Sequence, residues 1–230
     1  MLKAKMQGGL KGFLIKPPFL KRLFLMLIGV IVMGICVSVL KLTNFGTDPC
    51  SATNYGLCKL TGLSFGTIQV ITATIYFLIV ICFDYSKLGL GTIGNMLIVG
   101  YTADFTTYFI NNVLKITAID SFTIRLVVMF VTVALFVVAV ALYINAGLGA
   151  SAYDVLPNII YDKVTKNGKN KKIPYKVIRM GFDLFFTIMG FVLKGEAGVI
   201  TILMMLSLGP IIEYVSKIVG KLLKIDEAAD

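Results

Sequence analysis

Long apolar stretches separated by short polar segments dominate this chain. A helix needs about 20 apolar residues to cross a hydrocarbon core of about 30 Å, and six stretches approach or reach that length. They predict helices at Leu23–Leu40, Phe65–Phe83, Leu88–Ile110, Leu126–Ile144, Val177–Leu193 and Val199–Val219. The fold class expected is all-α, a polytopic membrane helix bundle with six transmembrane helices.

A segment of small residues follows the first and the fourth stretch. It opens with Asn44-Phe45-Gly46 in one place and with Asn145-Ala146-Gly147 in the other. After each comes a partly polar stretch that is too short to cross a membrane, at Cys50–Leu60 and at Ser151–Val164. Two short helices are therefore expected, either lying in the interface or re-entering the bundle. Asp48 suits an N-cap, Pro49 suits the first helical position, and Ser151 can cap the second short helix.

These correspondences indicate that the chain contains the same unit twice. Arg22 and Arg125 open similar strings, and the segment from Gly100 to Asp104 has a counterpart in Gly209 to Glu213. A unit with three spans must insert its second copy upside down, which is typical of secondary transporters. The predicted regions are a basic N-terminal segment (1–21), a first repeat (22–118), a second, inverted repeat (119–219) with a Lys-rich loop (163–176), and a tail (220–230).

Composition and charge support a membrane protein and give its orientation. Hydrophobic residues make up 57% of the 230 residues, charged residues 15%, and the mean hydropathy is +0.89. The net charge is +10, and most of the 22 lysines and arginines fall on the side of both termini, which the positive-inside rule makes cytoplasmic. A five-span alternative without the third span would put the Lys-rich loop outside, against that rule. Nucleic-acid binding is not expected, because that loop has no interleaved aromatic residues.

Ionisable residues within the spans are the candidate site residues, since each costs about 2.5–3.5 kcal/mol to insert unless it has a partner or a watery cavity. Arg179 and Asp183 lie four residues apart and share one helical face. They form either a self-neutralised pair or a solute site. The other candidates are Asp48, Asp154, Asp104, Glu213 and Gln69. For each of these a structural role as a cap, an ion pair or an interhelical hydrogen bond stays open beside the functional one.

Two further expectations concern glycines and helix starts. Glycines within the spans are expected at close helix–helix contacts; they are Gly91, Gly94, Gly100, Gly181, Gly190, Gly198 and Gly209. The free N–H groups at the starts of the two short helices would suit an anionic group.

The chain has no histidine and no CxxC spacing, which excludes His-based catalysis and the usual zinc sites. No enzyme activity, cofactor or metal is expected.

The small-residue segments resemble a signal found in a known family. Residues 46–52, residues 147–154 and the run Gly89-Leu90-Gly91-Thr92-Ile93 are similar to motifs of the YczE/YyaS/YitT family of bacterial membrane proteins. The first copy has Pro49 without the aspartate of that motif, and the second has Asp154 without its proline. The chain resembles the YczE-like branch, which has no soluble C-terminal domain. The resemblance implies a bacterial plasma-membrane protein and names no substrate.

The function predicted is a secondary transporter or permease for a small solute, working by alternating access between inverted halves. The alternative is a non-transporting membrane scaffold or regulator of another membrane protein. A membrane-embedded enzyme is the weakest of the three hypotheses. The partners expected are the lipid bilayer and an unknown small-molecule solute, with a homo-oligomer left open.

Overall fold

The computed structural model describes residues 18–166 and 173–223, and these contain helices and connecting loops but no strand. The α-helices are α2 (Pro18–Thr43), α3 (Pro49–Thr61), α4 (Phe65–Asp84), α5 (Leu90–Gly94), α6 (Gly100–Tyr108), α7 (Phe122–Asn145), α8 (Ala152–Lys166), α9 (Tyr175–Val192) and α10 (Val199–Leu223). A 3-10 turn, η1, occupies Tyr85–Lys87, and two π-helical turns occupy Asn95–Val99 (η2) and Phe109–Val113 (η3). The all-helical class is confirmed. Most of the basic N-terminal segment, part of the Lys-rich loop and most of the tail lie outside the described residues.

In the described part of the chain, four helices are long and apolar enough to cross a membrane, namely Phe19–Thr43, Phe65–Lys87, Phe122–Asn145 and Val199–Leu223. The predicted third span is helical, but π-helical turns divide it into α5, η2, α6 and η3. The predicted fifth span is α9, which carries three charged residues, Lys176, Arg179 and Asp183. The two short helices are present as α3 and α8.

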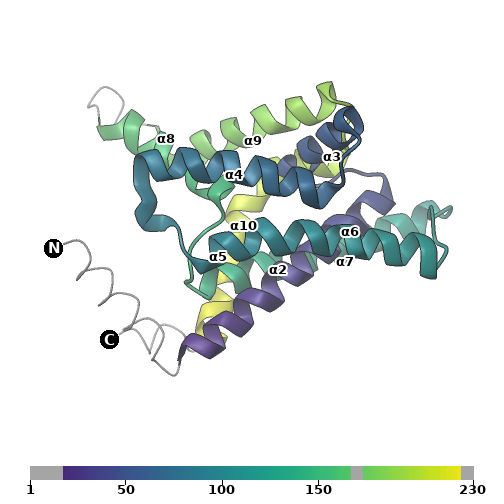
Figure 1. Ribbon diagram of the computed structural model, residues 1–230, viewed down its shortest axis with the longest axis horizontal. Coiled ribbons are helices and arrows are strands. Elements are labelled where there is room, and N and C mark those ends of the chain that lie inside the picture. The colour runs from purple at the N-terminus through teal and green to yellow at the C-terminus, as the bar shows by residue number, and fades with distance from the viewer. Residues whose placement is uncertain (1–17, 167–172, 224–230) are drawn as a thin grey trace.

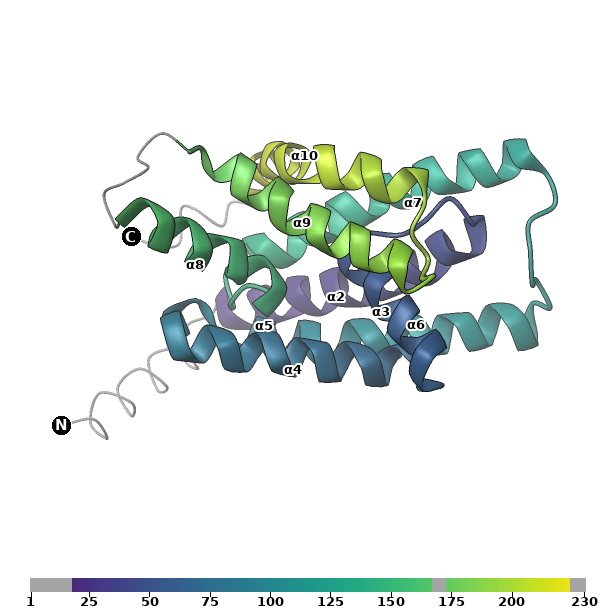
Figure 2. The same ribbon diagram turned by 90° about the horizontal axis from the view of Figure 1, so that it is seen from above.

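The short helices lie toward opposite ends of the molecule. In Figures 1 and 2, α8 lies near the end where α2 begins and α10 ends, whereas α3 lies toward the end where α2 finishes and α10 begins. The helices α2 and α7 pack along each other in the middle and carry much of the main core. Val30, Leu40 and Tyr143 are among the most deeply buried side chains there.

Matched loops join the two halves. Gly46, before α3, and Gly149, before α8, have φ values of +109° and +108°, in the left-handed region that favours glycine. The N–H of Ile200 donates to the carbonyl of Phe45 (3.0 Å), and the N–H of Gly91 donates to that of Leu148 (2.7 Å). Each loop is therefore held by the start of a helix from the other half.

The two loops match in a different register from the one that the sequence pattern suggests. The sequence pattern equates Gly46 with Gly147, but the matching backbone conformation and contacts belong to Gly149. Gly147 also has a positive φ (+63°), yet a Cβ there would meet only an Arg22 side chain. The Asn-x-Gly motif gave the wrong register because it reflects the local turn. It does not indicate which glycine contacts the other half of the chain.

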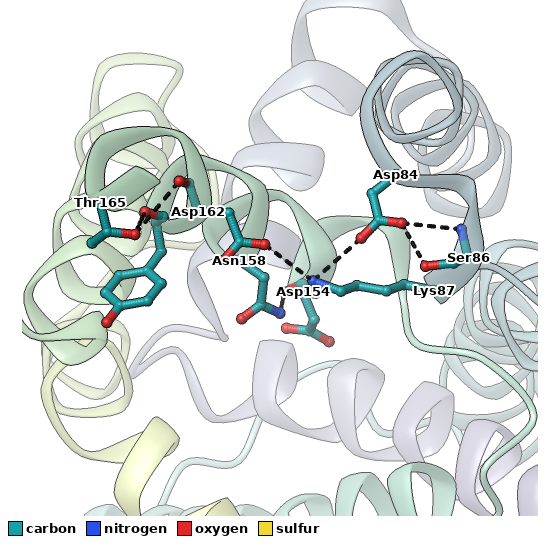
Figure 3. A network of polar contacts seen from close by, with 8 residues as sticks. Asp84, Ser86, Lys87, Asp154, Asn158, Asp162 and Thr165 are labelled. Carbon is teal, nitrogen blue, oxygen red and sulfur yellow. Dashed lines mark hydrogen bonds and ion pairs between the residues drawn. The ribbon is translucent and has the colours of Figure 1, made fainter. Parts of the chain in front are cut away.

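Ion pairs at opposite ends also match, with their charges exchanged. At the α3 end, Lys59 Nζ lies 3.0 Å from a Glu196 carboxylate oxygen. At the α8 end, Lys87 Nζ lies 3.9 Å from an Asp162 oxygen and 3.5 Å from an Asp84 oxygen (Figure 3). The Lys59–Glu196 pair joins the C-terminal part of α3 to the loop before α10. The Asp162–Lys87 pair joins the C-terminal part of α8 to the turn before α5.

The side chains are distributed as expected for a protein in lipid. Large apolar side chains such as Phe130, Ile75 and Leu203 are at least half exposed, while Asn54, Thr201 and Asp183 are buried. A soluble protein rarely exposes apolar area on this scale. The outer apolar surface and the four long apolar helices together identify a membrane protein.

The glycine prediction is confirmed in part. A Cβ at Gly91, Gly94, Gly100, Gly190 or Gly198 would meet atoms of another segment within 3.4 Å. At Gly181 and Gly209 the prediction was wrong, because no described atom of another segment lies within 4 Å of a Cβ there. Both glycines are exposed.

Candidate functional site

A cavity of about 100 Å³ lies between the two halves, where α3 and α8 begin. We call it the central cavity. Its polar and ionisable lining is Asp48, Cys50, Ser51, Gln69, Tyr76, Thr92, Asn95, Tyr143, Ser151, Tyr153, Asp154, Arg179 and Asp183. These residues come from both halves, and five of the seven candidate residues from the sequence are among them. A void of this size exceeds the roughly 10–15 Å³ that one water molecule needs, so it can hold several waters or a solute of a few heavy atoms.

Arg179 sits at one wall of the cavity between two carboxylates. Its Nε donates to Asp183 Oδ2 (3.0 Å) and its Nη1 donates to Asp154 Oδ1 (2.8 Å). The Tyr153 hydroxyl donates to the other Asp183 oxygen, Oδ1 (2.7 Å). The predicted pair within α9 is therefore present, and α8 adds a second acid and a tyrosine to it. Such a network holds the charges in a fixed geometry, because each group satisfies its neighbour.

The start of α3 also lines the cavity. Asp48 is the N-cap that the sequence predicts, with Pro49 as the first helical residue, and its Oδ2 accepts from the N–H of Ser51 (3.1 Å). Its other oxygen, Oδ1, is buried and has no hydrogen-bond partner among the described residues. Nearby, Gln69 Oε1 accepts from the Asn54 amide (2.6 Å), which links α4 to α3.

Two candidates lie elsewhere. Asp104 Oδ2 accepts from the N–H of Gly66 (2.8 Å) at the start of α4, so this carboxylate satisfies a free helix N–H group. Glu213 is exposed and pairs with Lys217 (2.7 Å) one turn further along α10. Their matching positions in the two halves thus correspond to different contacts. Within residues 18–166 and 173–223, no three His, Cys, Asp or Glu side chains are grouped to hold a metal ion.

Several lining residues were not predicted. Tyr153 directly precedes Asp154 in the sequence. Its position in the first turn of α8 could have indicated that it lines the same cavity. Asn95 is positioned by the π-helical turn η2, and such turns are frequent at functional sites. Tyr143 lies in α7, and nothing in the apolar sequence around it indicates that it reaches the cavity.

A second, larger cavity of about 570 Å³ adjoins the central one. The two share the lining residues Val140, Tyr143, Asp154, Arg179 and Ile212. The larger cavity continues along α10 past Gly209 and Glu213 to Lys217, toward the end of the molecule where α10 finishes. Asp154 and Arg179 therefore stand at the boundary between the two cavities.

The all-helical fold, its long apolar helices and a cavity that contains buried ionisable side chains define a helical membrane protein. The chain belongs to the family of unknown function DUF6198, whose model matches residues 20–217. No solved structure matches the chain significantly.

Two relatives cover most of the chain. One is the uncharacterized membrane protein YczE of Bacillus subtilis, 25% identical over 187 residues, which are 81% of this chain and 81% of the relative. The other is an uncharacterized protein of Haemophilus influenzae, 23% identical over 202 residues, or 88% of this chain and 86% of the relative. The resemblance to YczE-like proteins expected from the small-residue segments is confirmed.

Proposed function

We propose that this protein is a secondary transporter or permease that moves a small solute across the bacterial plasma membrane by alternating access. The central cavity carries the proposal, because it lies between the two halves and is lined by the starts of both short helices. Binding sites of many transporters occupy this place, at the interface of inverted repeats near the middle of the membrane.

The topology that belongs to this proposal has six spans and cytoplasmic termini. The helical stretch from 90 to 113 supplies the third span, and α9 supplies the fifth. The opposite placement of α3 and α8 and the matched loops of Gly46 and Gly149 support two inverted three-helix repeats. In this orientation the α8 end faces the cytoplasm, and the larger cavity is the cytoplasmic approach to the central one.

Transport rather than catalysis is proposed for the site. The ionisable groups of the cavity are arranged to bind and orient a solute, and the proposal includes no bond-making step. A saturable flux of solute through proteoliposomes would support a transporter, whereas binding without flux would favour the scaffold or regulator.

Alternating access can be tested on Cys50, which lines the cavity. In a variant with Cys36, Cys58 and Cys82 replaced by alanine, we expect a membrane-impermeant thiol reagent to label Cys50 from either side, in right-side-out and in inverted vesicles. A second variant that keeps only Cys58, near the far end of α3, should be labelled from the outside alone. Labelling of Cys50 from one side only, under all solute conditions, would contradict the proposal.

A further inference from the structure

We propose that the central cavity binds a small cation carrying N–H donors, of the ammonium, amine or guanidinium class, with Asp48 as its counter-ion. This inference rests on the proposed function, because it names the substrate class for the same site.

The charge of the lining favours a cation. Three carboxylates line the cavity, those of Asp48, Asp154 and Asp183, against a single guanidinium, that of Arg179. Arg179 already donates to both Asp154 and Asp183. No basic side chain of the lining is left to neutralise Asp48, so the cavity carries an excess of negative charge when its carboxylates are ionised.

Only one of the two oxygens of the Asp48 carboxylate has a hydrogen-bond partner among the described residues. The residue is 8% exposed, and its Oδ2 accepts from the N–H of Ser51, whereas Oδ1 has no partner in the part of the chain that the structure describes. Leaving a buried acceptor unpaired costs about 1–3 kcal/mol, and more when it is charged. The Tyr143 hydroxyl, from α7, is likewise buried, has no partner within residues 18–166 and 173–223, and belongs to the same lining. A bound cation with N–H donors would satisfy both oxygens.

Aromatic rings complete the lining. Tyr76, Phe136 and Tyr143 border the cavity together with Asp48. A carboxylate combined with aromatic faces is the usual surrounding of amine cations in proteins, since the ring faces attract positive charge. Rings of this kind would contribute little to binding an inorganic anion.

At both helix starts, which the sequence suggested as sites for an anionic group, carboxylates of the protein itself are already present. Pro49 has no N–H to offer, and the N–H of Ser51 is occupied by Asp48 itself. In the first turn of α8 an acidic residue, Asp154, is already present, and its N–H donates to the Ser151 carbonyl. The positive ends of both helices thus face carboxylates of the protein, and a second anion would be repelled.

Three planar solutes of four heavy atoms each make a sharp test, because they differ mainly in charge: guanidinium is a cation, urea is neutral and nitrate is an anion. Binding is measured by isothermal titration calorimetry on the purified full-length protein, with methylammonium as a second cation. We expect both cations to bind at millimolar concentration and neither urea nor nitrate to bind.

The matched variants are Asp48→Asn and Asp104→Asn. Both replace an acid that accepts a helix N–H by an amide that can keep this bond. We expect Asp48→Asn to weaken guanidinium binding by about tenfold or more, since the counter-ion is lost. Asp104→Asn, outside the cavity, should leave it unchanged. Thermal unfolding of both variants shows whether each remains folded.

The outcomes separate this inference from the proposed function. Binding of urea or nitrate in place of the cations, no binding of either cation, or equal effects of the two variants would each overturn the cation site. Flux of a neutral or anionic solute would overturn it too while leaving a transporter. Binding of guanidinium that depends on Asp48, without flux in proteoliposomes, would keep the site and overturn the transporter.

Discussion

At the scale of single residues, the acidic side chains of the central cavity differ in how many of their oxygens accept a hydrogen bond. Both oxygens of Asp183 are occupied, one by Tyr153 and one by Arg179, while one oxygen of Asp48 has no hydrogen-bond partner among the residues that the structure describes. Asp183 is therefore suited to hold Arg179 in place, and Asp48 is suited to meet the solute that we propose. Removing one member of a buried ion pair is costly, because the other charge stays behind without compensation.

The Arg179–Asp183 pair gives a stability prediction. We expect Arg179→Met to lower the free energy of unfolding by about 3 kcal/mol, because Asp183, which is 4% exposed, would lose its partner. The double variant Arg179→Met/Asp183→Asn should be more stable than Arg179→Met alone, since no buried charge then lacks a partner on α9. Thermal unfolding of the two single variants and the double variant in detergent measures this coupling. Strictly additive losses would contradict it.

At the scale of elements, glycines set how closely the loops of one half approach the other. A Cβ on Gly198 would collide with the carbonyl of Phe45, which is backbone and cannot turn aside. The loop before α3 and the start of α10 are therefore fixed against each other by the lack of a side chain. Gly181, in the middle of α9, has no such neighbour.

This contrast predicts opposite effects of the same substitution. Gly198→Ala should destabilise the protein by about 1–3 kcal/mol, because the backbone must move to admit the methyl group. Gly181→Ala should stabilise it by about 0.5–1 kcal/mol, since alanine is the better helix former and open space surrounds the site. Thermal unfolding in one detergent tests both. If Gly181→Ala lost as much stability as Gly198→Ala, the close contact of Gly198 with the Phe45 carbonyl would not explain the loss.

At the scale of the whole molecule, the pairs Lys59–Glu196 and Asp162–Lys87 mark the two ends. Lys59 and Asp162 are about half exposed, with side-chain accessibilities of 52% and 45%. Exposed pairs of this kind contribute only about 0–1 kcal/mol each, so they do not hold the fold together. Their value is as markers of topology, because equivalent positions of inverted repeats must face opposite sides of the membrane.

Single cysteines at these two positions test the inversion. In a cysteine-free background, we expect Lys59→Cys to react with an impermeant thiol reagent from the outside and Asp162→Cys to react from the cytoplasmic side. Permeabilised cells provide the control that both thiols are reactive. If both cysteines reacted from the same side, the two halves would not be inverted and alternating access between them would lose its basis.

Local sequence determined the helices and how the short ones begin. Apolar runs placed the helices to within a few residues, from Phe65 at the start of α4 to Val199 at the start of α10. Asp48-Pro49 determined the cap of α3, because the capping bond joins residues only three positions apart. The charged pair of α9 was equally readable, since Arg179 and Asp183 are one helical turn apart.

Tertiary structure alone decided which polar groups meet. Asp104 and Glu213 hold matching positions in the sequence, yet one satisfies the start of α4 and the other pairs with Lys217 at the surface. Asp48 and Asp183 look no more alike than those two, and they line the same cavity. Contacts of this kind depend on how helices that are far apart in the sequence pack against each other. The residue pattern of a single segment carries no information about that packing.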